Sequence, residues 1–172
     1  MNEPTLFDLF MYNIPLIAAA LMFIIPFGML ANATYKAVYK VNKVPTATAI
    51  LHYIPFYNYT MIRKYLYNSG LPVLIASILS VLCLVFRVVC LLACPTNLWM
   101  MAVSVYVILG GIVLWYLIMA FTAAYTAIMT RRSVFTIILS IVLPFFGAYI
   151  VSKNIGKFFE QELYKDSEFN PN

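Results

Sequence analysis

Arg87 is the only charged residue inside the apolar run of residues 71–94, which makes it the first candidate for chemistry. An arginine within a membrane segment can bind a carboxylate of a partner protein, a lipid phosphate or an anionic substrate. This chain offers no carboxylate there, because none occurs between Asp8 and Glu160. Alternatively, the side chain extends to the outer membrane surface, helped by backbone carbonyls near Cys94. Both interpretations stay open, and Arg87 is a candidate intramembrane contact.

Three cysteines share a predicted helix face with this arginine, because Cys83, Arg87, Cys90 and Cys94 follow a spacing of i, i+4, i+7 and i+11. Thiols spread over this length do not form one tetrahedral metal site without ligands from elsewhere. Successive cysteines on one helix are also poorly placed for a disulfide. We therefore interpret the face as a stripe of small residues for helix packing, with no metal site.

His52 and Asn32 are candidates for the polar lining of a path through the membrane. His52 is the only histidine, and it lies beside Tyr53. A histidine can act as a proton-sensitive gate, since its charge changes near neutral pH. We favour a hydrogen-bonded structural role, because a lone histidine beside tyrosine and asparagine is more often a structural group. The equivalent position of a second, similar segment holds Ile141, so the repeat does not require a histidine.

Known catalytic and cofactor-binding patterns are missing from the sequence. We find no nucleophile–base pair, no metal-ligand spacing, no phosphate-binding loop and no dinucleotide fingerprint. The lack of carboxylates between the two ends of the chain also disfavours acid–base catalysis and a proton relay. We therefore expect a protein that is not an enzyme and that uses no cofactor and no metal.

The composition is that of an integral membrane protein. The chain has 172 residues, of which 64% are hydrophobic and only 10% are charged, and its mean hydropathy is +0.91. So few charges do not cover the surface of a soluble domain. The net charge of +5 arises in short loops that flank apolar segments, so nucleic-acid binding is not needed to explain it.

One motif occurs twice, in residues 43–58 and 132–147. A basic residue opens about ten mostly apolar residues, which end in an aliphatic-Pro-Phe-aromatic turn, and a long apolar segment precedes each copy. We favour an internal duplication over chance similarity. The single membrane domain, 1–172, then comprises repeat unit one (13–67), a linking span (71–94), repeat unit two (98–153) and a polar tail (154–172).

Each motif is predicted to form a helical hairpin that is centred on its proline. An arm of ten helical residues rises only about 15 Å, which is half of the hydrocarbon thickness. Proline breaks a helix, so the chain is expected to reverse there. The predicted hairpin tips consist of Pro55, Phe56, Tyr57, Asn58, Pro144, Phe145, Phe146 and Gly147.

The placement of basic residues favours three crossings over five. If every apolar stretch crossed the membrane, six lysines would lie inside. Four basic residues, Arg63, Lys64, Arg131 and Arg132, would then lie outside. If both hairpins enter and leave on one side, all of these residues lie inside, as the positive-inside rule demands. The sequence therefore predicts an all-α protein with three transmembrane helices and two re-entrant or interfacial hairpins. We expect its N-terminus outside and its C-terminus in the cytoplasm.

Part of the chain resembles a family of small bacterial membrane proteins of uncharacterised function. The resemblance rests on Lys43-Val44-Pro45, on Ile54-Pro55-Phe56-Tyr57-Asn58-Tyr59 and on Gly70-Leu71-Pro72, and it covers roughly residues 36–75. The family's hallmark is an Ile-Pro-x-Tyr-Asn motif between two Gly-x-Pro-Gly-Trp turns, although this chain lacks the Gly-Trp pair. The resemblance implies a location in the bacterial plasma (inner) membrane and a non-catalytic role. In some bacteria a similar segment precedes a signal peptidase domain.

These observations lead to three functional hypotheses. We favour a non-catalytic subunit or scaffold of a bacterial membrane complex, with protein export or assembly as one hypothesis for its process. The expected partners are membrane lipids and other membrane protein subunits or further copies of this chain. The first alternative is a small channel or transporter with its path between the hairpin tips. The second is a protein that shapes the membrane by shallow insertion of its hairpins.

Overall fold

The computed structural model describes residues 6–41, 43–67, 70–93 and 96–169, and this part of the chain is helical without any strand. Three of its helices, α1, α4 and α5, are long and apolar enough to cross a membrane, as the sequence predicts. The helices are α1 (Leu6–Tyr39), α2 (Thr46–Leu51), α3 (Tyr57–Tyr67), α4 (Leu71–Ala93), α5 (Leu98–Met129), α6 (Val134–Val142) and α7 (Pro144–Phe169).

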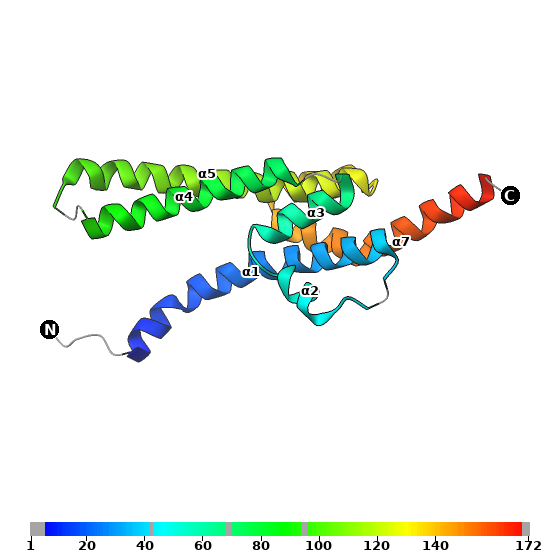
Figure 1. Cartoon of the computed structure of the whole chain (residues 1–172), viewed down its shortest axis with the longest axis horizontal. Coiled ribbons are helices and arrows are strands. Elements are labelled where there is room, and N and C mark those ends of the chain that lie inside the picture. Colours follow the sequence, from blue (N-terminus) through cyan, green and yellow to red (C-terminus); the bar gives the residue numbers. More distant parts are fainter. Residues whose placement is uncertain (1–5, 42, 68–69, 94–95, 170–172) are drawn as a thin grey trace.

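The molecule is elongated, and its two ends differ in construction (Figure 1). Helices α4 and α5 run antiparallel to each other and form an arm at one end, while the N-terminal half of α1 diverges from them. The C-terminal half of α1 packs against α7, and α3 packs against α1, α4 and α5. The middle of the molecule therefore holds a bundle, from which the arm and α1 extend separately.

Local sequence signals set the helix ends. The Asn97 side chain accepts a hydrogen bond from the backbone N–H of Met100 at 3.2 Å, and so caps the N-terminus of α5. Ser133 caps α6 in the same way, by accepting from the Thr136 N–H at 3.3 Å. Pro144 is the first residue of α7, where its missing N–H costs nothing.

The two long helices that precede the hairpins end in the same way. Lys40 follows α1 with a φ of 51°, and Arg131 stands near the end of α5 with a φ of 49°. One residue later, the Val41 N–H donates to the carbonyl five residues back at 3.2 Å, and the Arg132 N–H does so at 2.9 Å. Both are Schellman-type ends, which let a left-handed residue redirect the chain. The shared geometry favours the predicted internal duplication, which stays a prediction.

The hydrophobic core lies where α1, α3, α5 and α7 meet. Phe27 and Leu30 of α1 and Ile62 of α3 are completely buried there. The C-terminal half of α5 presents small side chains to this core, so that the neighbouring helices approach closely. The buried small residues of this half include Ala120, Thr122, Ala123, Ala124, Thr126 and Ala127.

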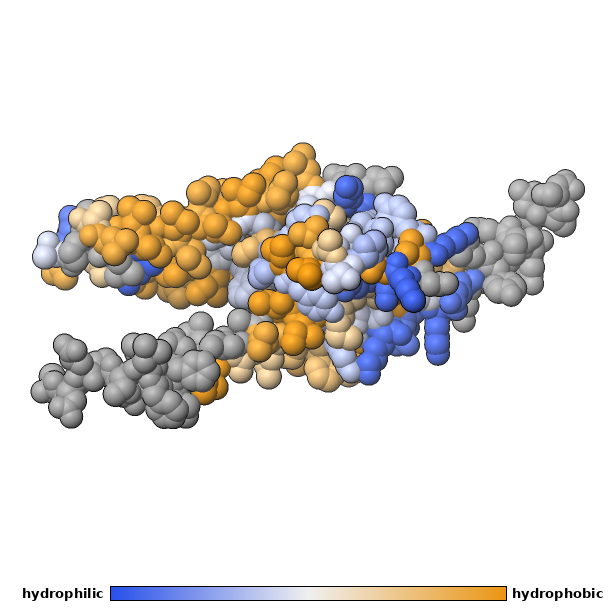
Figure 2. All heavy atoms as spheres, turned by 60° about the horizontal axis from the view of Figure 1, so that its bottom comes forward, coloured by the Kyte–Doolittle hydropathy of each residue, from blue (hydrophilic) through white to orange (hydrophobic). Residues whose placement is uncertain are grey.

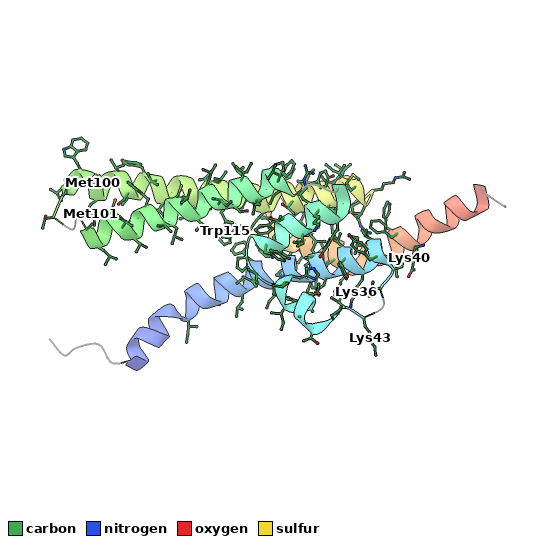
Figure 3. All side chains as sticks on the ribbon, in the orientation of Figure 1. Lys36, Lys40, Lys43, Met100, Met101 and Trp115 are labelled. Atoms are coloured by element: carbon green, nitrogen blue, oxygen red, sulfur yellow. The ribbon has the colours of Figure 1, made fainter. Side chains whose placement is uncertain are left out.

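Strongly hydrophilic side chains gather at one end of the molecule, whereas the surface of the opposite arm is mostly apolar (Figure 2). Figure 3 shows the lysines Lys36, Lys40 and Lys43 at the first end, with Met100 and Met101 at the other. The guanidinium of Arg63 belongs to the basic end as well, because it lies 4.4 Å from the ring centroid of Tyr125, near the C-terminus of α5. The hairpin α2–α3 therefore starts and finishes at the same end.

Helix α7 extends further than the repeat boundary in the sequence suggests. It continues through the predicted polar tail to Phe169. The reason lies in its apolar face, because Ile155 is buried and Phe159 packs against the core. These two residues are four positions apart, so they share one side of the helix.

Candidate functional site

The first hairpin tip reverses the chain between α2 and α3. The N–H groups of Tyr53 and Ile54 bond back to α2 at 3.0 and 3.1 Å, and the Asn58 N–H bonds to the carbonyl of Ile54 at 3.1 Å. Phe56 supplies the left-handed residue, with a φ of 66°. Asn58, which the sequence favours for the turn, lies instead in the first turn of α3. A left-handed phenylalanine costs about 1–2 kcal/mol, which its ring packing must offset.

The second hairpin tip, between α6 and α7, is tighter. Leu143 alone separates the two helices. The hydroxyl of Tyr116, in α5, lies 2.9 Å from the Ile141 carbonyl and 2.8 Å from the Val142 carbonyl. It therefore donates to carbonyls at the end of α6 that have no partner within the helix. A tip in lipid needs such cover, because each unsatisfied backbone group costs several kcal/mol there.

Glycine allows close contact within the second hairpin. A Cβ atom on Gly147 would lie 2.5 Å from the Cα atom of Ser140, so α6 and α7 touch backbone to backbone at this point. The sequence favours Gly147 for the turn, but the structure places it in the first turn of α7, next to α6. The lack of a side chain, and not a special backbone angle, explains why glycine suits this position.

The two tips meet at one level in the middle of the molecule. The Phe56 ring lies 6.1 Å from the Trp115 ring, and the Phe23 ring lies 5.4 Å from Trp115 and 5.7 Å from Phe145. Figure 3 shows Trp115 midway between the two ends. We call Phe23, Phe56, Trp115 and Phe145 the tip cluster. These rings bring α1, α5 and both hairpins together.

The distance of the tips from the basic end of the molecule follows from their contacts with α5. This helix rises about 1.5 Å per residue, so Trp115 and Tyr116 lie about 20 Å from its end at Met129. Both tips thus reach well past the basic end of the molecule.

The two predicted polar residues, His52 and Asn32, do come together. The Nδ1 atom of His52 bonds to the Oδ1 atom of Asn32, and its Nε2 atom lies 2.7 Å from the Tyr65 hydroxyl. Since a carbonyl oxygen only accepts, Nδ1 carries the proton, and Nε2 accepts from Tyr65. Neutral His52 thus uses both ring nitrogens. This network belongs to a layer of tyrosines near the basic end and does not face the space between the tips.

Asn58 is completely buried near the first tip. Its Oδ1 atom accepts from the Tyr59 N–H at 2.8 Å. Its Nδ2 atom, within the described residues, has no hydrogen-bond partner. A buried amide donor of this kind is a natural position for an ordered water molecule.

Arg87 finds its hydrogen-bond acceptors in α5. Its Nη1 atom donates to the Met101 carbonyl at 3.2 Å and to the Ser104 hydroxyl oxygen. Cys90 is buried on the same face, while Cys94 lies outside the described residues. These contacts give the arginine neutral partners within its own arm, and no acidic partner is required.

An apolar cavity of about 350 Å³ opens beside the tip cluster. Its walls come from α1, α4 and α5, and Pro55 and Phe56 of the first tip form part of its lining. Ser80 also lines it, but its hydroxyl already donates to the Gly111 carbonyl at 3.1 Å. The cavity therefore offers shape and apolar contact and no reactive group. The remaining lining residues are Ile24, Val81, Leu84, Ile108, Gly111, Ile112 and Trp115.

Comparisons with protein-family models, with curated proteins and with solved structures found no match. The resemblance of residues 36–75 to a bacterial membrane protein family stays a prediction.

Sequence reasoning missed two residues at the tips. Trp115 packs against Phe56 of the first hairpin, and Tyr116 covers the end of α6 in the second. The available signal was weak, because an indole and a phenol in the middle of an apolar span each have one N–H or O–H group that needs a partner. Their mid-helix position, away from the aromatic belts at the membrane surfaces, is the clue.

Proposed function

We propose that this protein is a non-catalytic subunit of a complex in the bacterial plasma membrane, and that a transmembrane helix of a partner occupies the cavity beside the tip cluster. The observation that carries the proposal is the divergence of α1 from the α4–α5 arm, with an apolar cavity of about 350 Å³ at its base. Most of the lining is apolar, with side chains such as Ile24, Leu84 and Ile108, and therefore suits the apolar face of a helix. The resemblance of residues 36–75 favours protein export or assembly as the process.

The chemistry of the described residues favours a non-catalytic role. Arg87 has neutral acceptors, His52 has both nitrogens engaged, and the cavity is lined by apolar groups. Among the described residues, no group of three His, Cys, Asp or Glu side chains is placed to hold a metal ion. These features support a role in binding and positioning.

The channel alternative has less support. A path between the hairpin tips would need polar lining, but aromatic rings from Phe56 and Phe145 join the tip cluster there. The membrane-shaping alternative requires shallow insertion of the tips, and the length of α5, 32 residues, is compatible with shallow as well as with deep insertion.

We also propose the topology of three crossings and two re-entrant hairpins, with the basic end in the cytoplasm. Its test is labelling of single cysteines at Tyr57, Asn68, Thr96 and Phe146 with a membrane-impermeant maleimide, after the native cysteines are replaced by serine. The position at Thr96 is expected to react from outside in intact cells, and it is the only one of the four to do so. Reaction of the Asn68 position from outside would refute the hairpin topology.

The subunit proposal predicts that the chain no longer binds its partner protein when a large side chain fills the cavity. Ile108→Trp places a large ring into the cavity, and Leu109→Trp is the matched control, because Leu109 does not line the cavity and is 51% exposed. Each tagged variant is purified from its native membrane in mild detergent. We expect Ile108→Trp to lower the yield of a co-purifying membrane protein at least fivefold, and Leu109→Trp to leave it unchanged.

Two results would overturn the subunit proposal. One is purification of monomer alone from the unmodified chain under the mildest conditions. The other is equal recovery of the same partner with both tryptophan variants, which would exclude the cavity as its binding site.

A further inference from the structure

We propose that a groove between the C-terminal end of α1 and α7 binds the phosphate headgroup of an anionic membrane lipid. The groove has a volume of about 530 Å³. Lys36 of α1 and Lys40, which directly follows α1, line one side, and Lys153 and Glu160 of α7 line the other. This inference is independent of the partner helix proposed above, because the groove lies at the basic end and not beside the tip cluster.

The charge of the groove suits a phosphate group. Three ammonium groups and one carboxylate leave an excess of two positive charges. Ammonium groups form strong, charge-assisted hydrogen bonds with phosphate oxygens. The Nζ atom of Lys153 also lies 4.5 Å from the ring centroid of Tyr149, a cation–π contact that restrains the long side chain beside the groove.

The remaining lining favours a lipid over a free anion. Ala33, Ala37, Ile155 and Phe159 contribute apolar surface. A Cβ atom on Gly156 would meet no atom within 4 Å, so the space beside α7 is open at this residue. A lipid headgroup carries its phosphate on a glycerol and acyl chains, which cover such surface, whereas inorganic phosphate leaves it exposed to water.

The position of the groove agrees with this occupant. The core residues Leu30 and Val151 lie on the same two helices, one to two turns toward the middle of the molecule. Lys43 lies beyond the groove, in the loop after α1 (Figure 3). The groove thus marks the boundary between the apolar and basic parts, where anionic headgroups of the cytoplasmic leaflet would lie.

The test is lipid binding to the purified full-length chain, followed by native mass spectrometry in detergent. The probes are phosphatidylglycerol, zwitterionic phosphatidylcholine and inorganic phosphate. Loss of one juxtamembrane lysine corresponds to roughly a fivefold loss of affinity for an anionic lipid. We therefore expect Lys36→Gln and Lys153→Gln each to weaken phosphatidylglycerol binding roughly fivefold, and Glu160→Gln to strengthen it.

Two further kinds of variant separate the groove from a general charge effect. Lys43→Gln and Lys64→Gln remove the same charge outside the groove and are expected to change binding less than twofold. Gly156→Leu keeps every charge but fills the open space, and it is expected to weaken binding as much as a groove lysine variant does. Circular dichroism of each variant checks that its helical content is intact.

Three outcomes would overturn the assignment. Equal loss of affinity in the Lys43→Gln and Lys36→Gln variants would show a diffuse attraction to the basic end. Equal binding of phosphatidylcholine would exclude recognition of anionic charge. Displacement of phosphatidylglycerol by inorganic phosphate at millimolar concentration would assign the groove to a free anion and not to a lipid.

Discussion

Replacing His52 by alanine is expected to lower the free energy of unfolding by about 3 kcal/mol. The imidazole is 1% exposed, and its nitrogens bond to Asn32 and Tyr65. The variant leaves a cavity and deprives both polar partners of their hydrogen bonds. Unfolding of the purified chain by SDS in mixed micelles, followed by circular dichroism, measures the effect.

A matched variant exists in the second hairpin. Ile141 stands three residues before Pro144, as His52 stands three residues before Pro55, and it is 51% exposed. Ile141→Ala is expected to cost less than about 1 kcal/mol, because the side chain is only partly removed from its surroundings. Equal losses in the two variants would contradict a structural role for the histidine network.

The same network predicts a dependence of stability on pH. Burial lowers the pKa of His52 below its ordinary value of 6.5. The unfolded chain therefore takes up a proton at a higher pH than the folded chain does. Stability is expected to be full above pH 6.5 and to fall as the pH drops below that value. In a His52→Gln variant this part of the pH dependence should disappear.

Replacing Tyr116 by phenylalanine is expected to cost about 1–3 kcal/mol, although only one oxygen atom is removed. The hydroxyl donates to the carbonyls of Ile141 and Val142 at the tip of the second hairpin. Without it, both carbonyls face an apolar environment, which offers no water as a substitute. The loss should appear in unfolding experiments in bicelles.

Tyr106 provides the control for this substitution. It lies on the same helix and is 75% exposed. Tyr106→Phe is expected to change the free energy of unfolding by less than about 0.5 kcal/mol. If Tyr116→Phe proved equally silent, the second tip would not depend on the hydroxyl, and water at the tip would have to satisfy the carbonyls.

Much of the architecture was predictable because few physical rules govern it. Length and hydropathy identify α1, α4 and α5 as possible spans, since a helix that crosses a bilayer needs about 20 apolar residues. Pro55 and Pro144 lie at the points where the chain reverses, because proline disrupts the helix that precedes it. The basic residues in the loops then indicated which ends of the helices lie on the same side of the membrane.

The contacts at the tips were not predictable in the same way. The pairing of Tyr116 with α6 depends on how α5 is rotated about its axis. The sequence of α5 places apolar side chains on every side of the helix. Its sequence therefore has little periodicity that would reveal which face turns inward. Phe56 shows a second limit, because a left-handed phenylalanine is uncommon and nothing in its own sequence marks it.

The lysine groove illustrates a third limit. Lys36 and Lys153 are more than a hundred residues apart in the sequence, and each alone is explained by the positive-inside rule. Only the packing of α1 against α7 brings them to one groove. The count of basic residues therefore identifies the basic end of the molecule, but it does not identify the groove between α1 and α7.

The divergence of α1 from the α4–α5 arm has a mechanical consequence. Close-packed helices near the basic end resist compression, whereas the two separate arms beyond the tip cluster can change their mutual angle. Membrane helices adapt to a thicker or thinner bilayer by altering their tilt. In this molecule a change of tilt would alter the angle between α1 and the α4–α5 arm, and we therefore expect the width of the cavity to vary with the thickness of the surrounding bilayer.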